Sequence, residues 1–139
     1  KAETIGGLMR ILVVDDDVRL LEEVKGILVR NGHSVDCADN ADKAVSMVKS
    51  DCYDFVLVDY RMPEHDGVWF MKNAALPRVT KVLLVTSYLD RGIIRQMFSA
   101  GICGYVTKPF DEGELLKHLE FHSVTRRTLN WVGGEETAV

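Results

Sequence analysis

The chain has 139 residues, of which 47% are hydrophobic and 27% are charged, and this suits one compact globular domain. Its formal net charge of −4 disfavours direct nucleic-acid binding through a basic surface. The chain shows no apolar stretch of transmembrane length, no signal-peptide pattern and no CxxC pair among its 3 cysteines. We therefore expect a reduced cytoplasmic protein without membrane contact.

Short apolar runs alternate with amphipathic stretches five times along the chain. The runs expected to form strands cover residues 10–14, 34–38, 55–58, 81–85 and 102–107. The stretches with helical spacing cover residues 18–30, 41–48, 67–75, 90–100 and a last segment that opens at Asp111. Strands that alternate with helices predict an α/β fold, a single doubly wound (βα)5 domain whose parallel five-stranded sheet is covered on both faces.

The two ends of the chain lack this pattern. Met9-Arg10 resembles a natural start, so residues 1–8 are expected to be an N-terminal extension or a cloning remnant. The last residues contain Gly133-Gly134 and no sustained periodicity, and residues 125–139 are expected to be a C-terminal tail or linker. The folded domain is therefore expected over residues 9–124.

Polar side chains follow four of the expected strands. Asp15 and Asp16 follow the first strand, Asp59 the third, Thr86 the fourth and Lys108 the fifth. Because ligand sites of parallel α/β sheets form outside the carboxyl ends of the strands, these groups are expected to converge at one rim. Each of them alone is weak evidence, but their joint occurrence at four strand ends indicates a site.

This set of residue types suits phosphoryl transfer. Neighbouring carboxylates repel each other and need a cation, and Mg²⁺ prefers oxygen ligands and uses one or two carboxylates together with a phosphate. An Asp carboxylate can also attack phosphorus and form an aspartyl phosphate. The ammonium of Lys108 and the hydroxyl of Thr86 would then bind the phosphoryl oxygens.

Over roughly residues 9–124, the chain resembles the receiver domain of two-component response regulators. The motifs that carry the resemblance are ILVVDDD at 11–17, VLVDYRMPEHDG at 56–67, VLLVTSY at 82–88 and YVTKPF at 105–110. The resemblance implies a flavodoxin-like sheet with strand order 2-1-3-4-5. It also implies a signalling domain rather than an enzyme, one that catalyses only its own phosphorylation and dephosphorylation.

The resemblance assigns the acceptor and the metal ligands. Asp59 matches the phosphoacceptor, and it would also bind Mg²⁺. Asp16 matches a direct Mg²⁺ ligand, Asp15 an acid that acts mainly through metal-bound water, and the backbone carbonyl of Arg61 a further ligand.

The resemblance also assigns the groups that respond to phosphorylation. Lys108 matches the lysine that binds the phosphoryl group, and its peptide bond to Pro109 is expected to be cis. Thr86 matches the hydroxyl that moves to the phosphoryl group, and Tyr105 the aromatic ring that turns inward when it does. In the family, side chains at the positions of Arg61 and Tyr88 flank the path of the hydrolytic water, so they are expected to tune the lifetime of the phosphorylated state.

Partners follow from the same resemblance. A sensor histidine kinase, a phosphotransfer protein or a small phosphodonor would supply the phosphoryl group. The surface formed by the fourth helix, fifth strand and fifth helix would control an output domain or a target protein. A homodimer is compatible with the resemblance, although Cys103 and Gly104 replace an acid used by the salt-bridged dimers of the winged-helix subfamily.

Two other functions are open on the sequence. Residues 14–18 also fit the first motif of haloacid-dehalogenase phosphatases, with Asp15 as nucleophile and Asp17 as acid/base, but that pattern leaves Asp59 unexplained. A receiver-like binding module that is never phosphorylated is the other alternative, and the complete set of site residues argues against it. His118 and His122 have the i, i+4 spacing of a metal-binding pair, but no third ligand is evident.

Overall fold

The computed structural model describes residues 7–135, with side chains described for residues 7–123. The strands are β1 (Arg10–Val14), β2 (Ser34–Ala38), β3 (Phe55–Val58), β4 (Lys81–Thr86) and β5 (Gly104–Thr107). The helices are α1 (Val18–Arg30), α2 (Ala41–Ser50), α3 (Gly67–Ala74), α4 (Arg91–Ala100) and α5 (Glu112–Glu135). All strand pairs are parallel, and the order β2-β1-β3-β4-β5 confirms the predicted doubly wound fold.

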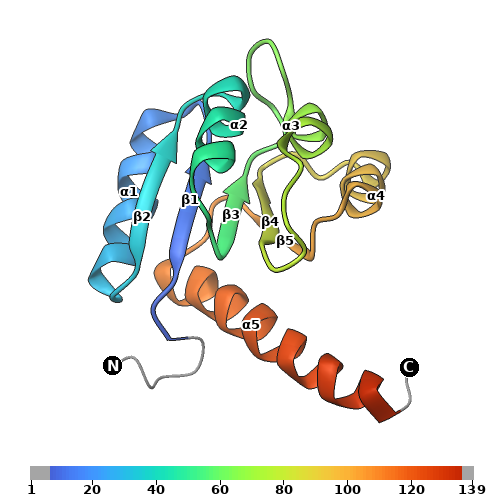
Figure 1. Cartoon of the computed structure of the whole chain (residues 1–139). Helices are drawn as coiled ribbons and strands as arrows, with labels where there is room; N and C mark the ends of the chain where they lie inside the picture. The colour runs from blue at the N-terminus through green and yellow to red at the C-terminus, as the bar shows by residue number, and fades with distance from the viewer. Residues whose placement is uncertain (1–6, 136–139) are drawn as a thin grey trace.

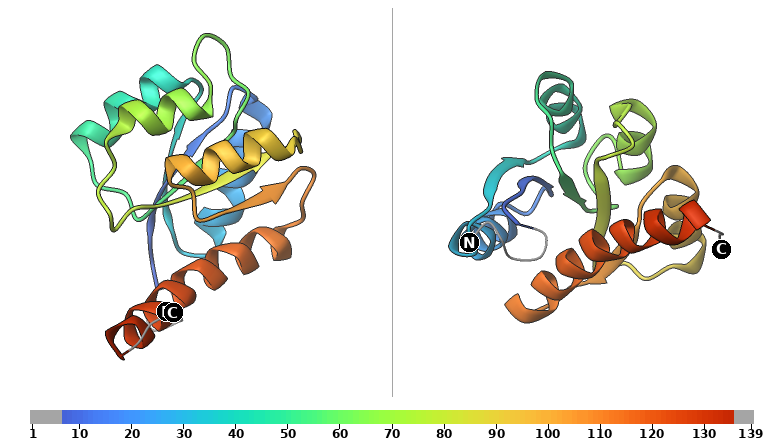
Figure 2. Two further views of the ribbon diagram at one scale, coloured as in Figure 1. Left: turned by 90° about the vertical axis from the view of Figure 1, so that its right-hand side faces the viewer. Right: turned by 60° about the horizontal axis from the view of Figure 1, so that its bottom comes forward.

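Two apolar cores lie on opposite faces of the sheet. One lies between the sheet and α2, α3 and α4, and the other between the sheet and α1 and α5 (Figures 1 and 2). Strand β1 contributes to both, because Leu12 and Val14 face the first core and Ile11 and Val13 face the second. Burial on both faces explains why the three central strands β1, β3 and β4 are almost continuous apolar runs.

Acidic and amide side chains fix where the helices begin. The residues that accept backbone N–H bonds as N-caps are Asp17, Asn40, Asp66 and Asp90. Asp111 and Glu114 form a reciprocal capping box at the start of α5, with donor–acceptor distances of 2.8 and 3.0 Å. These caps satisfy N–H groups that a helix leaves without partners in its first turn.

Helix α5 is longer than the sequence analysis predicted. The backbone is helical to Glu135, whereas a tail without regular structure was expected from residue 125. No glycine or proline interrupts residues 114–132, so the helical backbone can continue through this segment. It does so without the periodic apolar pattern from which a helix is predicted. The expected domain boundary at Val124 stays a prediction. Residues 1–6 of the expected extension and 136–139 of the expected tail lie outside the described residues.

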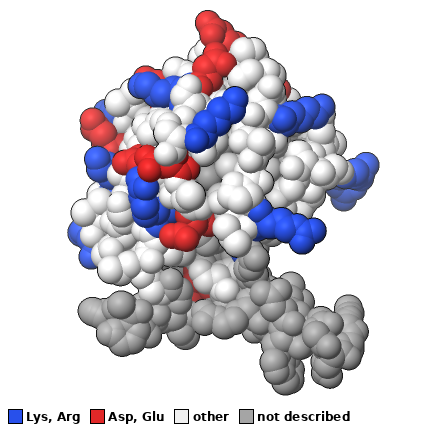
Figure 3. Space-filling model, viewed as in Figure 1, with Lys and Arg blue, Asp and Glu red and all other residues white. Residues whose placement is uncertain are grey.

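None of the helices within residues 7–135 combines the length and the apolarity that crossing a membrane requires. On the face seen in Figure 3, basic and acidic side chains are interspersed rather than gathered into one field.

Gly67 allows α3 to begin close against the segment that follows β3. Its amide donates to the carbonyl of Tyr60 at 2.7 Å. A Cβ atom at this position would lie 2.8 Å from the carbonyl oxygen of Asp59 and 3.1 Å from the Cα of Tyr60. Because these neighbours are backbone atoms, a side chain here would displace the segment that carries Asp59.

We expect Gly67→Ala to lower the free energy of unfolding by about 1–3 kcal/mol, because the added methyl group meets backbone. Gly26→Ala in α1 is the matched control. Its Cβ would meet only the end of the Arg30 side chain, at 3.5 Å. Alanine is the better helix former, so this variant should gain about 0.5–1 kcal/mol. Urea unfolding measures the free energy of unfolding of both variants. An equal change in the two would contradict the close approach of Gly67 to the backbone of Asp59 and Tyr60.

Candidate functional site

The carboxyl ends of the strands bring the predicted polar residues together. Asp15 follows β1 and Asp59 follows β3, and these strands are neighbours in register, with Val14 beside Val58. Asp15, Asp59 and Thr86 are the buried polar or charged side chains of the described residues, at 2%, 7% and 1% exposure. Polar side chains at adjacent strand ends that are buried rather than solvated indicate a functional site.

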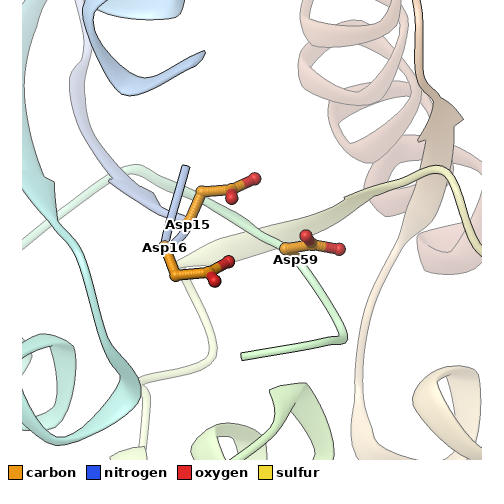
Figure 4. Close-up of side chains that lie close together, drawn as sticks. All are labelled: Asp15, Asp16 and Asp59. Carbon is orange, nitrogen blue, oxygen red and sulfur yellow. The ribbon is translucent and has the colours of Figure 1, made fainter. Parts of the chain in front are cut away.

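Asp15, Asp16 and Asp59 form a cluster of carboxylates. Each offers an oxygen, and the three oxygens lie within 4.8 Å of one another. Figure 4 shows the three side chains projecting from neighbouring strand ends into one region. Asp15 Oδ1 accepts the backbone N–H of Asp17 at 2.9 Å, and Asp59 Oδ1 accepts that of Tyr60 at 2.7 Å. These backbone bonds fix the orientation of both buried carboxylates.

Lys108, which follows the edge strand β5, contacts both buried carboxylates. Its Nζ donates to Asp15 Oδ2 at 2.8 Å and to Asp59 Oδ2 at 3.1 Å. The peptide bond between Lys108 and Pro109 is cis, the isomer expected from the sequence. One ammonium among three carboxylates leaves the cluster with excess negative charge.

The pKa values of Asp15 and Lys108 are both raised, for different reasons. Burial raises the pKa of Asp15 above its ordinary value, although the hydrogen bond from Lys108 acts in the opposite direction. Burial alone would lower the pKa of Lys108, but its hydrogen bond to Asp15 and the charge of Asp59 raise it overall. The contacts of Lys108 therefore favour its charged form, whereas burial disfavours the ionised form of Asp15.

The donor chemistry of the cluster fits a hard divalent cation. All three side chains offer carboxylate oxygens, the ligand type that Mg²⁺ prefers. Asp16 is exposed and the other two are buried, so a cation would be held between solvent and the buried carboxylates. This is the one group of three potential metal ligands found among the described residues.

Thr86 and Tyr105 lie on neighbouring strands in different surroundings. The buried Thr86 Oγ1 accepts the backbone N–H of Tyr88 at 3.1 Å. Tyr105 is 39% exposed, and the edge of its ring packs against Phe98 of α4, with centroids 6.4 Å apart. In this structure, the tyrosine ring therefore lies on the outer surface while the threonine hydroxyl lies at the rim of the site.

Arg61 and Tyr88 are in contact above the rim. The guanidinium carbon of Arg61 lies 4.1 Å from the centroid of the Tyr88 ring. Tyr88 also stacks on Tyr60, with centroids 6.2 Å apart and planes within 5°. The sequence analysis did not single out Tyr60. Its position directly after Asp59 is the signal that could have drawn attention to it.

The other sequence hypotheses find less support in the geometry. The side chain of Asp17 caps α1 by accepting the backbone N–H groups of Arg19 and Leu20, so it is engaged away from the role of an acid/base. The rings of His118 and His122 stack at 6.3 Å, and the imidazole of His122 packs directly against Gly104. This pair joins no third potential ligand within the described part of the chain.

The chain belongs to the response-regulator receiver domain family, whose model matches residues 11–120. This confirms the predicted family and a signalling domain rather than a classical enzyme. The family assignment therefore argues against the phosphatase alternative. Receiver domains bind Mg²⁺ at an acidic site, and this chain has a cluster of three carboxylates.

Known relatives agree with this assignment. The chemotaxis protein CheY-3 of Vibrio cholerae is 34% identical over 116 residues, which cover 81% of this chain and 89% of that protein. The transcriptional regulatory protein ResD of Bacillus subtilis is 31% identical over 107 residues, covering 77% of this chain but 45% of ResD. The chain thus spans about half the length of several regulators that it matches.

A solved structure with a related site is that of the response regulator TrrA from Thermotoga maritima in complex with Mg²⁺ and beryllofluoride. It is 30% identical, covers 81% of this chain and 96% of that chain, and superposes with a TM-score of 0.71.

We expect Lys108→Met to destabilise the metal-free protein by about 2–3 kcal/mol at about pH 7, because two buried carboxylates lose their shared partner. The pKa of Asp15 lies above its ordinary value, so its contribution to stability is present at low pH and is lost as the pH rises through the raised pKa. The cost of Lys108→Met should therefore shrink as the pH falls toward the pKa of Asp15.

Urea unfolding in the presence of a chelator measures this effect. The double variant Lys108→Met/Asp15→Asn is the control, because it removes one of the two carboxylates and should recover most of the loss. A cost that does not change with pH would contradict the charge argument.

Proposed function

We propose that this domain is a phosphorylation switch that accepts a phosphoryl group on Asp59. The observation that carries the proposal is the contact of one ammonium, Lys108 Nζ, with both buried carboxylates, Asp15 and Asp59. Asp16 completes a carboxylate cluster beside them. A nucleophilic carboxylate, a cation site and an ammonium beside them are the groups that phosphoryl transfer to an aspartate needs.

Mg²⁺ is the proposed cofactor. Asp16, Asp59 and the backbone carbonyl of Arg61 would bind it directly, and Asp15 would act mainly through metal-bound water. When bound, Mg²⁺ neutralises charge on the carboxylates and on the phosphoryl oxygens. The Mg²⁺–beryllofluoride complex of TrrA supports this assignment by similarity.

The transfer requires a donor with a labile phosphoryl bond. A carboxylate oxygen of Asp59 forms a bond to phosphorus while the bond from phosphorus to the donor breaks, and the electron pair of that bond leaves with the donor. For a phosphohistidine on a sensor kinase or a phosphotransfer protein, the leaving group is imidazole. Lys108 already lies within hydrogen-bond distance of Asp59, so it needs to move little to bind a new phosphoryl oxygen.

Phosphorylation would act on a surface through Thr86 and Tyr105. The Thr86 hydroxyl turns to the phosphoryl group, and Tyr105 turns inward from its exposed position against Phe98. A groove of about 430 Å³ lies beside this tyrosine, lined among others by His118 and His122. The change would alter the face formed by α4, β5 and α5, which we propose contacts an output domain, a target protein or a second copy of the chain.

We expect a small phosphodonor to label Asp59 in the presence of Mg²⁺. Asp59→Asn should remove the label completely, because an amide is not a nucleophile for this reaction. Asp15→Asn should weaken labelling through the loss of Mg²⁺ binding without moving the site. Mass spectrometry of the hydroxylamine-sensitive modification measures both. Labelling that survives in Asp59→Asn and is lost in Asp15→Asn would favour the phosphatase-like chemistry instead.

The lifetime of the phosphorylated state should depend on Arg61 and Tyr88. Hydrolysis needs a water in line with the bond between Asp59 and phosphorus, and these two side chains cover the rim in mutual contact. Neither is a good general base, since arginine stays protonated. We expect the double variant Arg61→Asn/Tyr88→Glu to lose phosphate about tenfold faster, which is about 1.4 kcal/mol in the barrier.

Dephosphorylation is followed at saturating Mg²⁺ after removal of the donor. The control is Lys49→Asn, which removes an exposed positive charge from the last turn of α2 and should keep the wild-type rate. An unchanged rate in the double variant would show that shielding by these side chains does not set the lifetime.

A further inference from the structure

Three side chains connect the two segments that carry the acceptor and the switch. Tyr60 and Arg61 follow β3, and Tyr88 follows β4. The ring of Tyr88 stacks on that of Tyr60, at 6.2 Å and 5°, and meets the guanidinium of Arg61, at 4.1 Å. Tyr88 therefore holds contacts to two consecutive residues of the neighbouring segment.

The backbones of the same residues bind the reacting and switching groups. Tyr60 N–H donates to Asp59 Oδ1 at 2.7 Å, and Tyr88 N–H donates to Thr86 Oγ1 at 3.1 Å. The stack thus joins the residue bonded to the acceptor carboxylate with the residue bonded to the switch hydroxyl. The contacts are local to the rim, while Tyr105 and Phe98 form a separate aromatic pair.

We propose that the Arg61–Tyr88–Tyr60 stack is a latch that holds the segment after β4 in its unphosphorylated conformation. The inference rests on the proposed function, because it assigns to the free domain a restraint on the step that follows phosphorylation. Arg61, Tyr88 and Tyr60 act here as positioning residues, since their effect reaches the phosphoryl group through Thr86 and Asp59.

The proposed restraint depends on the hydrogen-bond partner of the Thr86 oxygen in the free domain. In the free domain this oxygen accepts the amide of Tyr88, so the segment after β4 and the hydroxyl support one conformation. A turn of Thr86 toward the phosphoryl group takes the oxygen away from that amide, and Tyr88 must find a new position. The stack favours the position that Tyr88 has before this turn, and a contact made in one state only shifts the balance between the two states.

The size of the effect can be bounded. Tyr88 is 38% exposed, so its contact with the guanidinium is a partly solvated cation–π interaction. Such a contact shifts an equilibrium by about two- to fivefold. The latch is therefore a modest bias, which a phosphoryl group overcomes and which a single substitution can measure.

The test uses Mg²⁺ and beryllofluoride as the probe, with the complete chain. Titration is followed by the amide shifts of Thr86, Tyr88 and Tyr105 in ¹H–¹⁵N NMR spectra. Tyr88→Leu keeps bulk but removes both ring contacts, and Arg61→Gln keeps length but removes the cation. Each should bind beryllofluoride about two- to fivefold more tightly than wild type, because less of the binding free energy is used to release the loop. Each should also shift the Thr86 and Tyr105 amides toward their bound positions before any probe is added.

Two variants serve as controls. Tyr88→Phe retains the ring and is expected to retain the latch, and Lys49→Gln removes one exposed positive charge from the last turn of α2 and should match wild type. Unchanged or weaker affinity in both Tyr88→Leu and Arg61→Gln, with unshifted free-state spectra, would overturn the latch. A wild-type domain that does not respond to the probe at all would instead contradict the proposed function, so the two failures are distinct.

Discussion

The contact of Lys108 with two buried carboxylates is the constraint around which the rest of the site is arranged. A parallel sheet brings the ends of β1, β3 and β5 to one rim, and residues 15, 59 and 108 meet there. The ammonium makes burial of the acids tolerable but does not balance them, because Asp16 adds a third carboxylate. Such a site is stable enough to fold, yet its excess negative charge favours a divalent cation and a group that the ammonium can bind.

This charge imbalance explains how phosphorylation of Asp59 would affect the surface formed by α4, β5 and α5. A phosphoryl group on Asp59 would give Lys108 and the Thr86 hydroxyl new acceptors, and both groups have present partners that they must leave. The hydroxyl is bonded to the segment after β4, and that segment is held by Arg61 and Tyr60 through the ring of Tyr88. The response therefore depends on how a few contacts at the rim compete with the phosphoryl oxygens.

The sequence predicted the parts of the structure that depend on local pattern and topology. The apolar runs and the helical spacing between them placed the strands and helices, and the strand ends placed the acids and Lys108 at one rim. The stack of Tyr60, Arg61 and Tyr88 was not predictable as a unit, because it depends on side-chain directions across two loops. For Tyr60 the sequence offered only its position directly after Asp59. The length of α5 was also missed, since a helix that continues without an apolar face leaves no periodicity to read.

The most direct test of the account is a crystal structure of the chain with Mg²⁺ and beryllofluoride. We expect beryllofluoride to be bound to the carboxylate of Asp59, with Lys108 Nζ contacting a fluorine in place of Asp59 Oδ2. We also expect Mg²⁺ on Asp16, Asp59 and the carbonyl of Arg61, and the Thr86 hydroxyl turned toward the beryllofluoride. Beryllofluoride on Asp15, or a bound probe that leaves both Lys108 and Thr86 with their present partners, would contradict the account.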